Sequence, residues 1–420
     1  MAAHRRPVTG PPAAGRLGPR PLPAHLGVAI ATWMSSAAAL PLWKSGSLAW
    51  RKDLAPAAAS LAAEAAEVPP EDLARALAAE IGRRIESFQA GVGAYRDHPY
   101  RRTLEDPPVI WRAGTTRLLD YGAPGANGAA LLVVPSLVNR PWILDLLPKC
   151  SLLRNLAGRG LRPYLVDWDA PGAAERGFTI GDYVTKRLEP ALAAATKAAG
   201  GPIFVVGYCM GGLLALALAL RSQASVRGLV LLATPWNFHA GQPWPLPTLQ
   251  PVLAGLAGLA TTLGALPVDL LQLGFFAIDP LLAARKFSAF AGRVERGEET
   301  THYVAVEDWA NDGVPLAAAV ARECLLGWYG TNDPGAGRWT VAGARVRPAD
   351  FRRPCLVILP KRDRLVPYAS ALALAEAMPA AERRAPDLGH IGMIVGGRAP
   401  KDVWAPLADW LMKCGQRRPT

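Results

Sequence analysis

One stretch near the middle of the chain, residues 203–220, limits most strongly what this sequence can fold into. A short apolar run, Ile203–Val206, ends in the sequence Gly207-Tyr-Cys209-Met-Gly211-Gly212, and a run of Leu and Ala follows. The pattern predicts a buried strand, a sharp turn and a helix. A residue at the apex of such a turn is held at a strained backbone angle, so small residues are needed two positions before and after it. Cys209 is therefore predicted to stand on a tight elbow between Gly207 and Gly211. The alternative is a structural cysteine, because free Cys is among the most buried residue types.

Two residues much later in the sequence, Asp363 and His390, complete the pattern of a catalytic site together with Cys209. Asp363 follows the strand predicted at 355–359, and His390 lies in Gly389-His-Ile-Gly392 after another short predicted strand. An Asp in a turn is more often a solvated or capping residue, so Asp363 alone carries little weight. Nucleophile, acid and base in this order, each after a strand, is the order found in α/β-hydrolases. We therefore predict Cys209 as nucleophile, His390 as its base and Asp363 as the acid that orients His390.

Alternating strand and helix patterns predict an α/β-hydrolase fold with a mainly parallel sheet covered on both faces. The rhythm breaks in a Pro-rich and aromatic-rich region, where hydrolases carry a cap. The predicted organisation consists of a disordered tail, a helical N-terminal extension, a catalytic core in two pieces and a cap or lid insertion; their ranges are 1–25, 26–123, 124–233 with 346–415, and 234–345.

The loop after the strand predicted at 129–134 is expected to contribute to an oxyanion hole. In the hydrolase fold this loop supplies one backbone N–H, and the residue after the nucleophile supplies the other. These positions are Val138, or its neighbour Leu137, and Met210. The alternative is an ordinary strand-to-helix loop.

Composition excludes several classes of protein. The chain has 420 residues and is 51% hydrophobic, which excludes global disorder. Five widely spaced cysteines without a C-x-x-C pair argue against a disulfide framework or a zinc site, and favour a reducing cytoplasm. The net charge of +12 comes from scattered residues and not from a basic helix face, so nucleic-acid binding is not predicted. The charge fits either coding bias or attraction to anions such as CoA phosphates.

The uncharged stretch Leu26–Trp43 is the main feature of the N-terminal part. Basic residues precede and follow it, and its length is at the lower limit for a membrane helix. A signal peptide and a membrane span are both alternatives. We predict instead an apolar helix that docks on the protein or touches an apolar surface, because Ser, Thr and Pro41 dilute the run.

With these features in place, the chain resembles a polyhydroxyalkanoate synthase. The resemblance covers roughly 124–410 and rests on four stretches, of which the Gly-x-Cys-x-Gly-Gly box is the most specific. They are Val134–Leu146, Val166–Pro171, Gly207–Gly212 and Gly389–Gly392 with Asp363 upstream. Trp309–Asp312 and Val341–Gly343 are similar in a looser way. Asn237 departs from the family pattern, in which an Asp is expected.

The resemblance implies a homodimeric, granule-associated cytoplasmic enzyme that polymerises (R)-3-hydroxyacyl-CoA and releases CoA. Cys209 would carry the acyl group, His390 would be its base, and Asp363 would orient His390 or activate the incoming hydroxyl. No cofactor and no metal are expected, since the CoA thioester is the substrate. The length of the chain is closer to that of the small synthases, which need an accessory subunit.

Two other functions remain open at this stage. A depolymerase or thioesterase could use the same three residues, and would release free acid instead of polymer. A non-catalytic granule-associated homologue would not require Cys209, Asp363 and His390 together.

Overall fold

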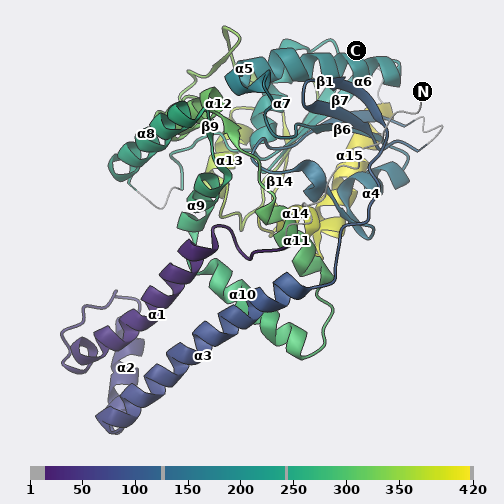
Figure 1. The fold of residues 1–420 in the computed structure, drawn as a ribbon. Helices are drawn as coiled ribbons and strands as arrows, with labels where there is room; N and C mark the ends of the chain where they lie inside the picture. Colours follow the sequence, from purple (N-terminus) through teal and green to yellow (C-terminus); the bar gives the residue numbers. More distant parts are fainter. Residues whose placement is uncertain (1–14, 124–127, 242–244, 417–420) are drawn as a thin grey trace. The chain divides into compact units, whose positions relative to one another are not determined.

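The computed structural model describes residues 15–123, 128–241 and 245–416. The described chain forms two compact units (Figure 1). The first contains residues 101–271 and 312–416, and the second contains residues 15–100 and 272–311. Each unit is built from segments that are distant in the sequence, and each is described by itself below.

An eight-stranded sheet forms the centre of the first unit. Its strand order is β1-β2-β6-β3-β7-β8-β13-β14; β2 runs antiparallel to both of its neighbours, β1 and β6, and the neighbours from β6 to β14 are parallel. The strands are β1 Val109–Ala113, β2 Thr116–Asp120, β3 Ala130–Val134, β6 Arg162–Asp167, β7 Ile203–Tyr208, β8 Val226–Leu232, β13 Cys355–Ile358 and β14 Glu382–Arg384. The predicted elbow strand, β7, is central, between β3 and β8. Because parallel strands are buried on both faces, β3 and β7 read as continuous apolar runs.

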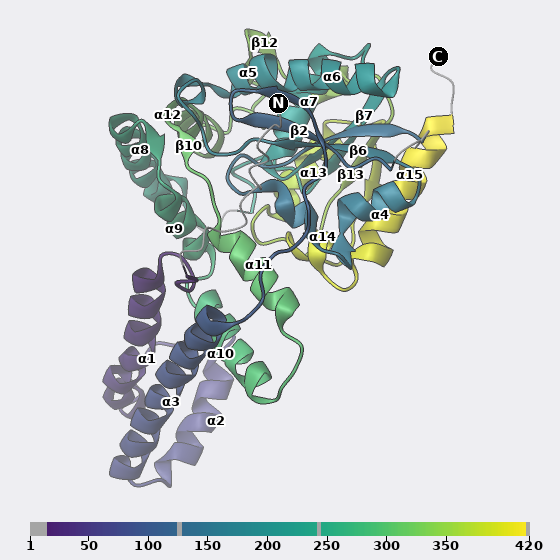
Figure 2. The same cartoon turned by 45° about the vertical axis from the view of Figure 1, so that its right-hand side comes forward.

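Helices cover both faces of this sheet, as the sequence predicts (Figure 2). One face packs against α7 and α6, and the largest cluster of buried apolar side chains lies there. On the other face the Phe204 ring of β7 meets Trp410 of α15, with centroids 5.8 Å apart. The helices of the first unit are α4 Leu152–Gly158, α5 Ile180–Tyr183, η3 Val184–Leu188, α6 Glu189–Ala199, α7 Met210–Arg221, α8 Leu246–Leu263, α12 Ala318–Arg322, η4 Glu323–Gly330, α13 Tyr368–Glu376, α14 Gly392–Val395, η6 Pro400–Trp404 and α15 Ala405–Gln416.

Short elements connect these larger ones. Within the described residues, three two-stranded pairs lie outside the main sheet: β4 Asp145–Leu147 with β5 Cys150–Ser151, β9 Ala265–Leu266 with β10 Leu316–Ala317, and β11 Thr340–Val341 with β12 Ala344–Arg345. The same residues include the 3₁₀ turns η1 Pro141–Leu144, η2 Glu175–Gly177 and η5 Pro348–Asp350.

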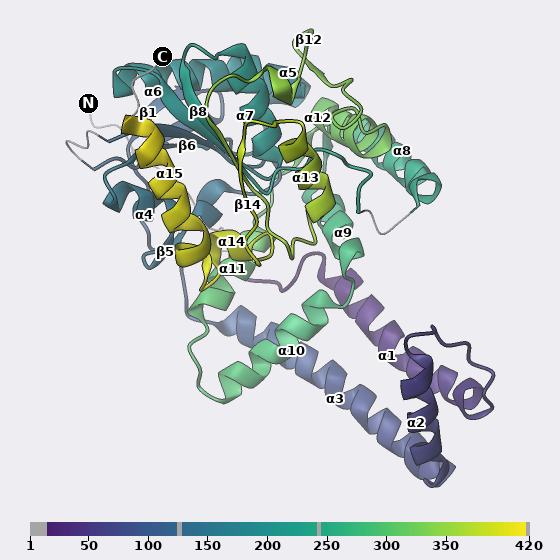
Figure 3. The same ribbon diagram turned by 180° about the vertical axis from the view of Figure 1, so that it is seen from behind.

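The second unit is helical (Figure 3). Its helices are α1 Leu22–Lys44, α2 Ala55–Ala66, α3 Pro70–Asp97, α10 Leu282–Glu295 and α11 Thr301–Asn311, and α9 Val268–Ile278 runs across the boundary between the units. Helix α3 begins at Pro70 with two acids in its first turn, where proline and acidic residues favour a helix start. Helices α3 and α10 meet closely at Gly91, where a Cβ atom would lie 2.0 Å from the Phe287 carbonyl oxygen.

The two units of the structure do not coincide with the domains predicted from the sequence. Of the cap predicted at 234–345, residues 272–311 belong to the helical unit and the others to the unit with the sheet. Of the tail predicted at 1–25, residues 1–14 lie outside the described part. The Arg16 side chain is largely buried in an ion pair with Asp308, and α1 already begins at Leu22, so the segment from Arg16 onward is not a free tail. Burying the guanidinium against a carboxylate fixes this segment.

Two described helices, α1 and α8, have the length and apolar composition that a membrane crossing requires. In α1 Ala29 alone is buried. Core helices and signal sequences also meet this criterion, so the observation leaves the role of α1 open.

Candidate active site

The elbow predicted around Cys209 is present at the carboxyl end of β7. Cys209 has φ 57° and ψ −130°, an unfavourable conformation for a residue with a side chain, and α7 begins at the next residue. A Cβ atom on Gly207 would lie 2.4 Å from the Gly212 Cα, and one on Gly211 would lie 2.2 Å from the Val134 carbonyl oxygen. Both glycines therefore allow backbone segments to approach that any larger residue would separate. The strain at Cys209, on the order of 1–3 kcal/mol, is outweighed by the surrounding packing.

The structure brings His390 and Asp363 together beside the elbow. The His390 Nδ1 atom lies 2.7 Å from the Asp363 Oδ2 atom, and both side chains are buried. The other carboxylate oxygen of Asp363 accepts the backbone N–H groups of Leu365 and Val366 at 2.9 and 2.8 Å. Asp363 is thus fixed on both oxygens, and it leaves the Nε2 side of the imidazole for the thiol. Cys209 lies close enough to His390 to contribute to the raised pKa of the imidazole.

Charges next to His390 favour its protonated form. Burial by itself lowers the pKa of this imidazole. The charge of Cys209 and the hydrogen bonds with Asp363 and Cys209 outweigh burial, and raise the pKa to about 10. The raised pKa makes His390 a stronger base than a free imidazole.

Tyr208 also touches His390, and the sequence analysis did not identify it. Its ring stacks on the imidazole, with centroids 5.1 Å apart and planes 28° apart. Its hydroxyl donates to the His390 carbonyl oxygen at 3.1 Å. The only sequence signal was its place directly before the predicted nucleophile, which does not reveal a contact 182 positions away.

The two predicted oxyanion donors are placed differently. Met210 is the first residue of α7, so its N–H lies at the positive end of the helix dipole. The N–H of Val138 is directed at the Ser136 hydroxyl of its own loop, at 3.4 Å. At that distance the bond is weak, and an oxyanion is the stronger acceptor.

The loop that carries Val138 is held on one side by the segment that follows α11. The Val314 N–H donates to the Val138 carbonyl at 3.1 Å, and Asn139 forms an isolated bridge with Gly313. The Asp312 carboxylate accepts the Trp142 indole N–H at 3.2 Å. The bond from Trp142 gives Asp312, the last residue of the loosely matched motif Trp309–Asp312, a structural role.

Arg140, in the same loop, adds an electrostatic attraction to the contact between the loop and Asp312. Its guanidinium pairs with Asp169, and its Nε atom lies 3.7 Å from Asp312. Burial raises the pKa of Asp312, while Arg140 opposes that rise. Neutralising Asp312 would therefore weaken the tie to Arg140.

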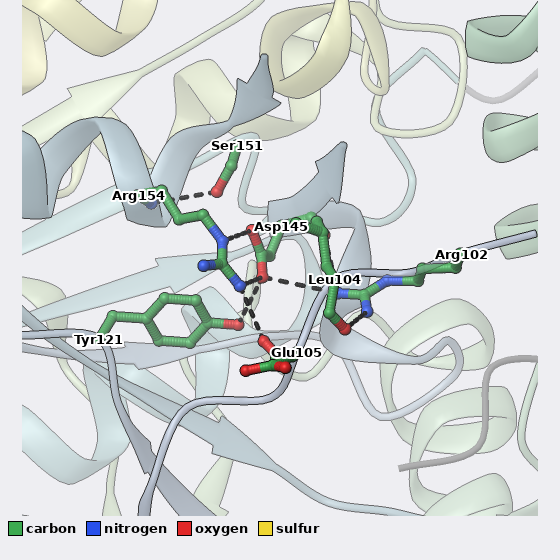
Figure 4. A network of polar contacts seen from close by, with 7 residues as sticks. All are labelled: Arg102, Leu104, Glu105, Tyr121, Asp145, Ser151 and Arg154. Atoms are coloured by element: carbon green, nitrogen blue, oxygen red, sulfur yellow. Dashed lines mark hydrogen bonds and ion pairs between the residues drawn. The ribbon is translucent and has the colours of Figure 1, made fainter. Parts of the chain in front are cut away.

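A second network holds the far end of the loop, where η1 ends (Figure 4). The Asp145 side chain is fully buried, and both its oxygens accept from Arg154, at 2.8 and 3.0 Å. Tyr121 donates to it at 3.2 Å, and Arg102 lies at 3.5 Å. Ser151 caps α4 by accepting the Arg154 N–H. The whole segment from Val138 to Asp145 is therefore fixed at both ends.

Aromatic side chains from the predicted cap pack against one another in the first unit. The Phe238 ring is 4.9 Å from Tyr329 and 5.5 Å from Trp328. Tyr329 lies at the edge of this cluster and is 38% exposed. Asn237, the departure from the family pattern, accepts from the Asn332 amide at 2.9 Å. In the described residues no group of three or more potential metal ligands occurs.

Comparison with known proteins agrees with this geometry. A family model described as alpha/beta hydrolase fold matches residues 130–397. The chain therefore belongs to the α/β-hydrolase fold family, as the order of Cys209, Asp363 and His390 predicts.

Within that family its relatives are polymerases. Poly(3-hydroxyalkanoate) polymerase subunit PhaC of Allochromatium vinosum is 29% identical over 311 residues, which cover 73% of this chain and 86% of that protein. The PhaC subunit of Synechocystis is 29% identical over 67% of this chain and 77% of its own length. The PhaC of Haloferax mediterranei is 27% identical over 72% of this chain and 63% of its own length. The resemblance to polyhydroxyalkanoate synthases is confirmed by these relatives.

Proposed function

We propose that this chain is a polyhydroxyalkanoate synthase that forms its polymer through a thioester on Cys209. The observation that carries the proposal is a cysteine, where hydrolases usually have serine, on a strained elbow in contact with a buried His390–Asp363 pair. The polymerase relatives support the same reaction class.

The acylation step follows from the positions of these groups. His390 takes the proton of Cys209, and the thiolate attacks the carbonyl carbon of (R)-3-hydroxyacyl-CoA. The S–C bond to Cys209 forms, the bond to the CoA sulfur breaks, and CoA leaves as a thiol after taking the proton from His390. The N–H groups of Met210 and Val138 stabilise the tetrahedral oxyanion, each by an amount on the order of 3 kcal/mol. Asp363 keeps the imidazole in the required tautomer.

Elongation uses the energy kept in the thioester. Exchange of one thioester for another is close to thermoneutral, so the acyl group on Cys209 stays activated. The hydroxyl of a second hydroxyacyl unit loses its proton to His390 and attacks the acyl carbon, which forms an ester and returns the Cys209 thiol. The bonds between Asp363 and its loop favour orientation of His390 as the role of Asp363, over direct activation of the hydroxyl. Elongation also requires that water be kept away from the thioester.

The test is CoA release from (R)-3-hydroxybutyryl-CoA by the purified chain, with products weighed by mass spectrometry. We expect CoA and a series of growing oligomers from the wild type, and neither from Cys209→Ala. Release of free 3-hydroxybutyrate alone would replace the synthase proposal by a thioesterase.

A Cys209→Ser variant sharpens this test. A serine ester lacks thioester activation, so we expect acylation at a much reduced rate and no elongation. If the serine variant made polymer as well as the wild type, the thioester would not be essential and the proposal would fail.

The remaining expectations about partners are proposals of the same kind. We propose a cytoplasmic homodimer that works at the surface of polymer granules, with or without an accessory subunit. Sedimentation of the purified chain during turnover checks whether it forms a dimer and works at polymer granules. Addition of a polymerase accessory subunit from a relative's organism checks whether such a subunit is needed, and a large gain in CoA release is the expected sign of a requirement.

A further inference from the structure

We propose that Tyr208 is a positioning residue, which holds His390 by two separate contacts and so fixes the base relative to Cys209. The first contact is the ring stacked on the imidazole at 5.1 Å, and the second is the hydroxyl that donates to the His390 carbonyl at 3.1 Å. This inference rests on the proposed role of His390 as the base.

The place of Tyr208 in the fold makes it suitable for this task. It is the last residue of β7, the strand that pairs with β3 and β8 on its two sides, and it is 3% exposed. Cys209 is the next residue. One peptide unit therefore links the nucleophile to the side chain that holds the base, so the separation of thiol and imidazole is set by a central, fully paired strand of the sheet.

His390 needs an anchor because of where it lies in the chain. It occupies a turn between β14 and α14, outside regular structure. The carbonyl groups on either side of it, at Gly389 and Ile391, accept backbone N–H groups at the start of α14. The His390 carbonyl takes the Tyr208 hydroxyl, a donor from a different part of the fold. Loss of that hydroxyl would leave a buried carbonyl unsatisfied and the turn free to shift.

The ring has an electrostatic effect as well. A cation within about 6 Å of an aromatic face is attracted by the ring quadrupole. The groups that face His390 are the Asp363 carboxylate, the Cys209 thiol and the Tyr208 ring. The nearby pair of Arg362 and Asp387 is mostly solvated. The Tyr208 ring therefore favours the imidazolium that forms when Cys209 loses its proton.

Two variants separate the contacts. Tyr208→Phe keeps the ring and removes the donor, and Tyr208→Leu removes both. The matched control is Tyr164→Phe, since Tyr164 is fully buried on β6 and its hydroxyl has no hydrogen-bond partner within the described residues. The readouts are the rate of Cys209 alkylation by iodoacetamide and the titration midpoint of His390, followed by NMR in ¹⁵N-histidine-labelled full-length protein.

We expect Tyr208→Phe to slow alkylation at pH 7 by about three- to tenfold, with the His390 midpoint unchanged. Tyr208→Leu should also lower that midpoint by about one pH unit. Tyr164→Phe should change neither quantity.

Equal alkylation rates in the wild type and Tyr208→Phe would overturn the proposal, as would an equal slowing in Tyr164→Phe. If Tyr208→Leu fails to fold, Tyr208→Phe decides alone. Neither readout uses an acyl-CoA, so a failure of polymer synthesis leaves this test intact. Normal polymerisation with unaffected Tyr208 variants would refute only the role of Tyr208.

Discussion

The Asp363 carboxylate shows how much depends on a single side chain. One oxygen bonds His390 and the other is held by two backbone N–H groups, so its orientation is fixed before substrate arrives. Preorganisation of this kind gives the imidazole one tautomer, with Nδ1–H toward the carboxylate and Nε2 toward the thiol.

Replacement of Asp363 by Asn tests that tautomer. The oxygen of the new amide can still accept the backbone N–H groups of Leu365 and Val366. Its NH₂ group would donate a hydrogen bond to the His390 Nδ1 atom, which reverses the direction of the bond that Asp363 makes. The Nε2 atom would then carry the proton, and could not accept one from Cys209. In triads of this kind such a change lowers kcat by about 10³- to 10⁴-fold. CoA release measures it, with Asp387→Asn, from an exposed pair with Arg362, as the control. A loss of less than about tenfold would mean that Asp363 does not orient His390.

The raised pKa of His390 predicts a particular dependence of stability on pH. The folded state stabilises the protonated form of His390. The contribution of His390 to the free energy of unfolding is therefore complete below its ordinary pKa of about 6.5. The contribution decreases as the pH rises toward the folded value of about 10. We expect the difference in unfolding free energy between wild type and His390→Gln to shrink from pH 6.5 to pH 10, measured by urea unfolding. A difference that stays constant across this range would contradict the prediction.

The residues of the proposed active site could be named from sequence, whereas the residues that support them could not. Cys209, Asp363 and His390 each follow a strand, and strand ends are local features. Tyr208 and Asp312 act through contacts that form only when distant segments fold together. No local pattern of residues encodes such contacts.

At the level of elements, the loop from Val138 to Asp145 is the part of the site whose shape depends most on its neighbours. One end is tied to Asp312 and Val314, and the other to the buried carboxylate of Asp145. A donor on this loop can meet an oxyanion only if both ties hold, because displacements of about 1 Å can cost 10²-fold in rate.

Substitution of Asp312 tests the first tie. Asp312→Asn keeps an acceptor for Trp142 and loses the attraction to Arg140, so we expect a severalfold fall in kcat. Asp312→Ala loses both, and the fall should be about 10²-fold, the cost of losing one oxyanion donor. KM should stay nearly constant in both variants, as measured in the CoA-release assay. Glu189→Gln, from a partly exposed pair with Arg221, is the control. A change confined to KM would place Asp312 in substrate binding instead.

Substitution of Asp145 tests the second tie through stability. Asp145→Ala leaves two guanidinium groups beside an empty, buried position, and should cost about 3–5 kcal/mol of unfolding free energy. Asp53→Ala, which breaks the exposed pair with Arg51, should cost about 0–1 kcal/mol. Urea unfolding of the two variants provides the comparison. Equal effects would show that the Asp145 network does not stabilise the fold.

Strands β3, β7 and β13 were predicted well, because each is a continuous apolar run. The distribution of 234–345 between two units was not foreseen. Residues 272–311 pack with α3 through Gly91 and the Phe88–Phe287 ring contact, which join positions nearly two hundred residues apart. The aromatic content of this segment predicted burial, but not against which partner.

For the molecule as a whole, α1 is notable for the apolar surface that it leaves exposed. It is an apolar helix of 23 residues with a single charge at its last position, and Met34 and Leu42 are more than half exposed. A helix that is apolar on all sides is stable when covered by protein or by an apolar phase. We expect it to contact polymer granules.

Lysine substitutions test this expectation better than truncation, because the preceding segment is part of the fold through Arg16. The double variant Met34→Lys, Leu42→Lys should lose most of its partition into pelleted polymer particles, while CoA release from soluble substrate stays within about twofold, since exposed substitutions of this kind rarely alter folding. Glu64→Gln with Glu67→Gln, on and beside α2, raises the net charge by the same two units and is the control. Partition equal to that of the wild type would exclude α1 as the contact.

The assembly of the helical unit from 15–100 and 272–311 has a consequence for anyone who wishes to dissect this protein. A shortened chain that starts after residue 100 would still carry α10, whose Phe287 and Phe290 would have lost their cover from α3. Such a fragment should aggregate and express poorly, however sound its catalytic centre. Co-expression of the first hundred residues as a separate polypeptide should restore solubility and expression of the fragment. The two polypeptides have complementary surfaces, so they can associate without a peptide bond between them.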